Sequence, residues 1–166
     1  IQGQSIASRN IFFGYNASDE NIDALVAGIV ANPDDHYFLV LEKSGEWIGT
    51  LHIAKYGKND VEFGFMLDEH HRGQGYGDRL MDEGLIWARN RGFDEVFLHC
   101  VASNKPVQFL CRKHGLEVTT EFGESETKAK LPPPDLFSIT KEMSVRNRQA
   151  WRLILQKTFP VLEAID

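Results

Sequence analysis

Three glycines on alternate positions, Gly73, Gly75 and Gly77, stand between an apolar run and a helix-like pattern. The apolar run, VEFGFML over 61–67, alternates as a strand with one buried face does. A strand, a glycine-rich turn and a helix direct several backbone N–H groups and the positive end of a helix dipole at one point. Glycine also lets the main chain approach a phosphate closely. The segment therefore predicts an anion site, and a turn that only packs the strand against the helix is the alternative.

Two common phosphate-binding loops do not match this segment. A P-loop needs Gly-Lys-Ser/Thr at the start of its helix, whereas this chain has Gly77, Asp78 and Arg79 there. A dinucleotide-binding fold places its glycines after the first strand of a parallel βαβ unit. Here the glycines follow the fourth predicted strand of a meander, so both folds are disfavoured.

Length and composition limit the class of protein. The 166 residues predict a single domain, 1–166, with a C-terminal helical tail at about 145–166. No apolar run approaches the roughly 20 residues of a membrane span. The formal charge of −6 argues against a nucleic-acid-binding surface. Two cysteines are too few for a disulfide scaffold and predict a cytoplasmic location. We therefore expect neither membrane nor nucleic acid as a partner.

Apolar spacing predicts the other elements. Strands are expected at 10–15, 36–42, 47–57, 61–67, 95–101, 116–122 and 136–144, and helices at 17–32, 76–91, 106–114 and 145–163. Ser18 is the expected cap of the first helix. The near-continuous apolar run at 36–42 predicts a strand buried on both faces. The segment 123–135 is polar and proline-rich, which predicts a loop.

The stretch VEFGFMLDEHHRGQGYGDRL resembles the acyl-CoA-binding segment of the GNAT superfamily of N-acetyltransferases. That family's motif is Arg or Gln, two residues, Gly, one residue, then Gly or Ala, which Arg72, Gly75 and Gly77 match. The later stretch VFLHCVASNKPVQFLCRKHGLE is similar to the family's next strand, Asn and helix, with Asn104 at the expected spacing. The resemblance covers roughly residues 36–122, and two motifs in the right order make it more specific than either alone.

The resemblance implies an α/β (α+β) fold with a mixed, mostly antiparallel sheet of six or seven strands. The sheet would be splayed between its fourth and fifth strands, 61–67 and 95–101, with helices on both faces. Acetyl-CoA would be the cosubstrate, with its pyrophosphate on the glycine turn and its pantetheine arm in the splay. The implied coenzyme-binding residues are Met66, Leu67, Arg72, Gly73, Gln74, Gly75, Tyr76, Gly77 and Asn104.

Acetyl transfer to an amine needs a base and a donor to the oxyanion, and an acid helps the departing thiolate. His99 is the first candidate base, because an imidazole with an ordinary pKa near 6.5 accepts a proton near neutral pH. Glu62 is the second candidate, and the backbone N–H of Leu67 is the expected oxyanion donor. Cys111 stands where the family often has Tyr, so it is either the acid or a packing residue.

The expected function is transfer of the acetyl group of acetyl-CoA to a primary amine, on a small molecule, a peptide N-terminus or a lysine. Acidic residues such as Asp19 and Glu20 would suit a cationic acceptor. The alternative is a catalytically weak GNAT-like module that binds acyl-CoA as a sensor or interaction domain. A homodimer through the C-terminal helix or strand is a further option. No metal is expected, because the adjacent His70 and His71 lack the companions of a ligand set.

Overall fold

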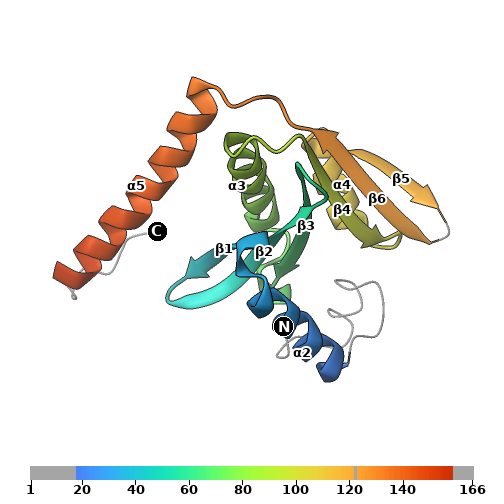
Figure 1. Cartoon of the computed structure of the whole chain (residues 1–166). Helices are drawn as coiled ribbons and strands as arrows, with labels where there is room; N and C mark the ends of the chain where they lie inside the picture. Colours follow the sequence, from blue (N-terminus) through green and yellow to red (C-terminus); the bar gives the residue numbers. More distant parts are fainter. Residues whose placement is uncertain (1–17, 122, 159–166) are drawn as a thin grey trace.

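The computed structural model describes residues 18–121 and 123–158 (Figure 1). The strands are β1 (His36–Lys43), β2 (Glu46–Tyr56), β3 (Asp60–Leu67), β4 (Glu95–Val101), β5 (Glu117–Glu121) and β6 (Glu124–Lys130). The α-helices are α2 (Asp19–Ala31), α3 (Tyr76–Asn90), α4 (Lys105–Lys113) and α5 (Leu136–Thr158), and the short 3-10 helices are η1 (Pro33–Asp35) and η2 (Glu69–His71). The strand predicted at 10–15 lies outside the described residues.

The described strands form one sheet in the order β1-β2-β3-β4-β6-β5. Every neighbouring pair is antiparallel except β3 and β4, which are parallel. The parallel contact contains only three residue pairs, from Asp60–Glu95 to Glu62–Phe97. Beyond Glu62 and Phe97 the two strands diverge (Figure 1). The expected mixed, mostly antiparallel α/β sheet with a splay between these two strands is confirmed.

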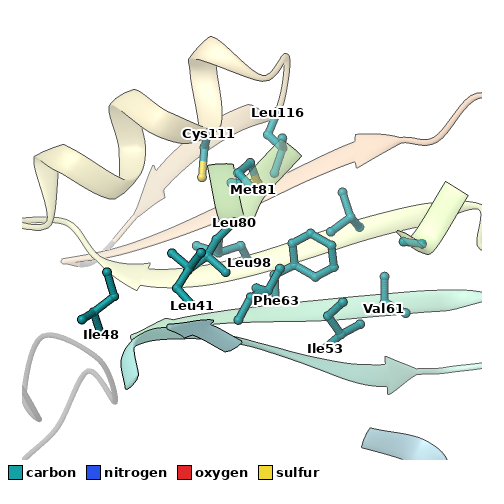
Figure 2. Close-up of a cluster of buried hydrophobic side chains, with 13 residues drawn as sticks. Leu41, Ile48, Ile53, Val61, Phe63, Leu80, Met81, Leu98, Cys111 and Leu116 are labelled. Atoms are coloured by element: carbon teal, nitrogen blue, oxygen red, sulfur yellow. The ribbon is translucent and has the colours of Figure 1, made fainter. Parts of the chain in front are cut away.

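The hydrophobic core lies on the face of the sheet that α3 and α4 cover (Figure 2). Leu51 and Phe63 on neighbouring strands point toward α3, where Gly84 permits close contact. A Cβ atom at Gly84 would collide with the Leu51 side chain and lie 3.1 Å from the Phe63 ring. Glycine at this helix position therefore sets how closely α3 approaches the sheet.

We call the opposite side of the sheet the second face. It carries the alternate residues of the same strands, because successive side chains of a strand point to opposite faces. By the strand registers, its central side chains are His36 and Phe38 of β1, His52 and Ala54 of β2, Glu62 and Met66 of β3, Phe97 and His99 of β4, and Glu126 and Lys128 of β6.

The prediction that 36–42 is buried on both faces is wrong. Tyr37, Phe38 and Val40 of β1 are 39%, 45% and 40% exposed. Among the described strands β1 is at the edge of the sheet and pairs only with β2. An apolar run is buried on both sides only where neighbouring elements cover both, and at β1 the covered side chains are those of Leu39 and Leu41.

The loop predicted at 123–135 is also wrong, because it contains the strand β6. The inward residues of β6 are Ser125 and Thr127, which are buried although they are polar. Thr127 Oγ1 donates to the carbonyl oxygen of Leu98 at 3.0 Å, and Gln108 Nε2 donates to Ser125 Oγ at 3.0 Å. Hydroxyl groups satisfied in this way take the place of the apolar residues that would have marked a strand.

The strand predicted at 136–144 is wrong, because this segment begins α5. The carboxylate of Asp135 accepts the backbone N–H of Ser138 at 2.7 Å, and Ser138 Oγ accepts the N–H of Asp135 at 3.1 Å. This reciprocal capping starts a helix directly after three prolines. Leu136 and Phe137 are 79% and 70% exposed, so their apolar character does not reflect burial in a sheet.

The helix predicted at 145–163 begins nine residues earlier, at Leu136, and its predicted end lies outside the described residues. The other helix and strand predictions within the described residues are confirmed to within one or two residues at their ends. Ser18 caps α2 as expected, since its Oγ accepts the N–H of Asn21 at 3.3 Å. Among the described helices, none combines the length and the apolar character that crossing a membrane requires.

Candidate active site

The glycine turn links β3 to α3. Gly73 and Gly75 have φ angles of 73° and 86°, which glycine adopts without the strain that a side chain would bring. Gly75 is the N-cap of α3 and offers no side chain to the helix end. The first N–H groups of this 15-residue helix therefore have no capping side chain, and a helix end of this kind binds anions.

The acidic side chain at this turn is paired with two basic residues, and a lysine lies nearby. Asp78, the acidic residue of the first turn of α3, accepts hydrogen bonds from Lys113 Nζ at 2.7 Å and His114 Nε2 at 2.8 Å. These two contacts, Lys113 first, hold the pKa of the Asp78 carboxyl below its ordinary value. Lys43 Nζ lies 5.6 Å from the centre of the Tyr76 ring, so β1 contributes a cation that sequence reasoning missed.

The other predicted coenzyme residues lie on both sides of the splay. Arg72 Nε donates to the carbonyl oxygen of Leu67 at 3.2 Å, and Gln74 Nε2 donates to that of His70 at 2.9 Å. Asn104 follows β4 and caps α4, since its Oδ1 accepts the N–H of Val107 at 3.4 Å. The turn and Asn104 thus follow the two strands that separate.

The direction of the Leu67 backbone follows from a neighbouring hydrogen bond. Asp68 N–H donates to the carbonyl oxygen of Ile48 in β2 at 2.9 Å. Because the hydrogen-bonding groups of an antiparallel strand alternate in direction, the N–H and C=O of Leu67 and Phe65 point away from β2, toward the splay. Those of Met66 point toward Thr50 of β2. Phe65 is therefore a further backbone neighbour of the splay, not expected from the sequence.

The structure brings the two candidate bases together. His99 Nδ1 lies 2.9 Å from Glu62 Oε1, on the second face, where the β3–β4 pairing ends. A carboxylate only accepts hydrogen bonds, so Nδ1–H donates to Glu62 and Nε2 keeps its lone pair. The two side chains are 51% and 41% exposed, so the pair is accessible from the second face.

Cys111 lies in the core and does not reach the second face. Its side chain is fully buried beside Met81 and Leu116 (Figure 2). Burial raises the pKa of its thiol to about 11. A thiol with that pKa is a weaker proton donor than an ordinary cysteine, so this position is suited to packing.

Two further histidines contact each other on the same face, beside Glu62. His36 Nδ1 and His52 Nε2 are 2.9 Å apart, and the ring of Phe38 stacks on His52 with centroids 4.6 Å apart. Burial, followed by the charge of His36, lowers the pKa of His52. Sequence reasoning missed this group, although alternate positions of adjacent predicted strands carry it.

No group of three or more potential metal-ligating side chains occurs among the residues that the structure describes. The family model for the acetyltransferase (GNAT) family matches residues 6–116. The chain belongs to the GNAT acetyltransferase family. Its general reaction is therefore acetyl transfer.

Solved structures with the same fold agree with this GNAT assignment. Ribosomal-protein-alanine N-acetyltransferase from Brucella melitensis is 20% identical, with a TM-score of 0.60, over 76% of this chain and 90% of that one. Spermidine N-acetyltransferase from Vibrio cholerae, solved with CoA and spermine, is 15% identical, with a TM-score of 0.64, over 76% and 84%. The protein yncA from Salmonella typhimurium, solved with acetyl-CoA, is 19% identical, with a TM-score of 0.60, over 79% and 89%. No curated protein gives a significant match to the chain.

Proposed function

We propose that the chain transfers the acetyl group of acetyl-CoA to a primary amine. The observation that carries the proposal is the hydrogen-bonded His99–Glu62 pair, placed where β3 and β4 separate. A base oriented by a carboxylate is what deprotonation of an ammonium group requires. The pair lies on the sheet whose separating strands lead to the glycine turn and Asn104.

The coenzyme would span the end of the splay. Its pyrophosphate would lie on the N-terminus of α3, where Gly75 provides no capping side chain. Arg72, Gly73, Gln74, Tyr76 and Gly77 complete the turn. The pantetheine arm would pair with the backbone of Phe65 and pass Leu67, whose N–H stays available for the acetyl oxygen. Asn104 would border the arm from the side of β4. The acetyl thioester supplies the activated carbonyl carbon.

The chemistry then follows from the positions of these groups. Nε2 of His99 takes the proton from the amine, and Glu62 stabilises the imidazolium that forms. The amine nitrogen bonds to the carbonyl carbon, the N–H of Leu67 stabilises the oxyanion, and the carbon–sulfur bond breaks. Coenzyme A leaves as a thiolate and takes its proton from water or from His99, because Cys111 is fully buried.

The acceptor classes are a small-molecule amine, a peptide N-terminus or a lysine. The structural neighbours include an enzyme named for ribosomal-protein alanine and one solved with spermine, so both kinds belong in the test. The assay incubates the protein with acetyl-CoA and each amine, and follows thiol release and acetylated product by mass spectrometry. The acyl-CoA-binding module would instead be supported by two results together. Thiol release with every amine would be no faster than hydrolysis of acetyl-CoA without an amine, and coenzyme A would raise the thermal stability of the protein.

We also propose that the chain forms a homodimer through α5. The helix contacts α3 with charged residues, since Lys141 and Glu142 pair with Asp82 and Arg91 at 2.7 and 3.0 Å. Four apolar side chains in the described first part of α5 instead form an exposed stripe, namely Leu136, Phe137, Ile139 and Met143, with Phe137 being 70% exposed. A second copy would cover this stripe with its own α5 in a two-fold contact. Light scattering should give twice the monomer mass, and Phe137→Glu should give the monomer.

The two cysteines of the described chain are both free. Free thiols persist in a reducing compartment, which supports the cytoplasm as the location.

A further inference from the structure

Gly64 leaves a position without a side chain on the second face. It pairs with His52 of β2 in the β2–β3 register. The β3–β4 pairing ends at Glu62–Phe97, and beyond it His99 of β4 lies on the same face across the splay, joined to β3 by its contact with Glu62. Gly64 therefore lies on the second face beside His52, and the next residues of β3 on that face are Met66 and Glu62, of which Glu62 contacts His99.

The backbone does not require glycine at this place. Gly64 lies inside β3 and lacks the positive φ that favours glycine at the turns of the described chain. Glycine weakens the interior of a strand, and there it often marks a site that a ligand or another backbone approaches closely. Its missing side chain would point to the second face, so packing of α3 does not explain it either.

Both imidazoles are held by neighbouring side chains, His52 by residues of β1 and His99 by a residue of β3. His52 is fixed by His36 at 2.9 Å and by the ring of Phe38, whose plane is 11° from its own. His99 is fixed by Glu62 at 2.9 Å. Burial lowers the pKa of His52, so its ring is neutral near pH 7 and does not repel an approaching ammonium group.

We propose that the acceptor amine reaches His99 over Gly64, in a subsite bounded by His52 and His99 that is one missing side chain wide. Such a subsite takes an amino group on an unbranched methylene, as in an alkylamine, a polyamine or a lysine side chain. It rejects an amino group on a branched carbon, such as a peptide α-amino group. The inference rests on the proposed acetyl transfer and narrows its acceptor class.

Two isomeric amines of similar basicity test this subsite. Thiol release from acetyl-CoA is measured with n-butylamine and with sec-butylamine, and wild-type kcat/KM should favour n-butylamine at least about tenfold. Gly64→Ala should lower kcat/KM for n-butylamine by a similar factor and leave coenzyme A affinity unchanged. Gly28→Ala is the matched control, because a Cβ there meets no atom within 4 Å. It should leave kcat/KM for both amines unchanged.

The outcomes separate this inference from the proposed function. Equal kcat/KM for the two amines, or an unchanged Gly64→Ala enzyme, overturns the subsite and leaves acetyl transfer standing. If Gly64→Ala does not fold, the wild-type ratio of the two amines still decides.

A binding measurement covers the case in which neither amine reacts. In the coenzyme A complex, n-butylamine should shift the NMR signals of the His52 and His99 rings in the wild type and not in Gly64→Ala. No shift in the wild type overturns the subsite, whereas a shift without turnover with any amine of the screen overturns only the proposed reaction.

Discussion

A lone imidazole on a sheet surface can rotate, and Glu62 removes that freedom from His99. The 2.9 Å contact fixes both the ring orientation and the tautomer. We expect His99→Ala to lower kcat about 10²-fold or more, because the amine then loses its positioned base. Glu62→Gln should lower kcat by less, since the amide keeps the contact without the charge. Coenzyme A affinity, measured by calorimetry, should stay unchanged in both variants.

An unchanged kcat in His99→Ala would mean that Glu62 or water acts as the base. It would leave the family assignment intact, because that rests on the match over residues 6–116.

Cys111 illustrates the opposite situation, a reactive residue type in a site that suppresses its reactivity. Its pKa of about 11 is raised by burial, so the folded state holds the thiol proton more tightly than the unfolded state. The stabilisation is complete below about pH 9 and is lost as pH rises toward 11. Cys111→Ala should therefore show a smaller loss of unfolding free energy over this range in urea titrations, with kcat at neutral pH unchanged.

A several-fold fall of kcat in Cys111→Ala would contradict the packing role. Cys111→Ser separates packing from polarity, because it keeps a small side chain beside Thr127, the hydrogen-bond neighbour of the thiol, while burying a more polar group.

The sequence identified His99 and Glu62 separately, and only the fold shows that they touch. Their contact depends on the parallel register of two strands that α3 separates in the chain. Local periodicity assigns a residue to a face but does not determine which strand lies beside it. For the same reason the sequence does not single out His52 and Gly64, since their roles depend on their neighbours on adjacent strands.

At the scale of elements, the glycine turn is the part that the sequence predicted most completely. Gly75 has φ of 86° and Gly123, in the β5–β6 hairpin, has φ of 89°, so alanine strains both positions alike. Gly75→Ala should lower coenzyme A affinity at least about tenfold, since its Cβ would stand at the anion site on the helix end. Gly123→Ala should lose comparable stability and keep the affinity. Calorimetric titration and thermal unfolding of both variants test this, and equal affinities would place the pyrophosphate elsewhere.

The elements that the sequence misassigned fail for identifiable reasons. Ser125 and Thr127 are buried and hydrogen-bonded, so β6 has the composition of a loop and the position of an inner strand. The first turn of α5 is capped by Asp135 and Ser138, yet its exposed Leu136 and Phe137 suggest a strand. Apolar patterning predicts an element only where apolar residues are the buried ones.

At the scale of the whole molecule, two three-stranded units meet through three residue pairs of β3 and β4. The β1-β2-β3 unit packs against α3, and the β4-β6-β5 unit packs against α4 (Figure 1). The family resemblance predicted this separation, because it concerns the order of elements. It did not predict which side chains lie together on the second face.

The final prediction concerns the inner edge of β3, where the coenzyme would pair as an added strand. The backbone N–H groups of Phe65 and Leu67 point toward the splay, whereas those of Gly64 and Met66 point toward β2. In amide hydrogen exchange followed by NMR, Gly64 and Met66 should be protected without ligand, Phe65 should gain protection on addition of coenzyme A, and Leu67 should gain it on addition of acetyl-CoA. Adenosine 3′,5′-bisphosphate, which has phosphates but no pantetheine arm, should leave Phe65 and Leu67 unprotected. Strong protection of these two amides in the free protein would mean that other groups already occupy the splay. Equal protection of Phe65 by coenzyme A and by the bisphosphate would show that the pantetheine arm does not pair with β3, and the oxyanion role of Leu67 would fall with it.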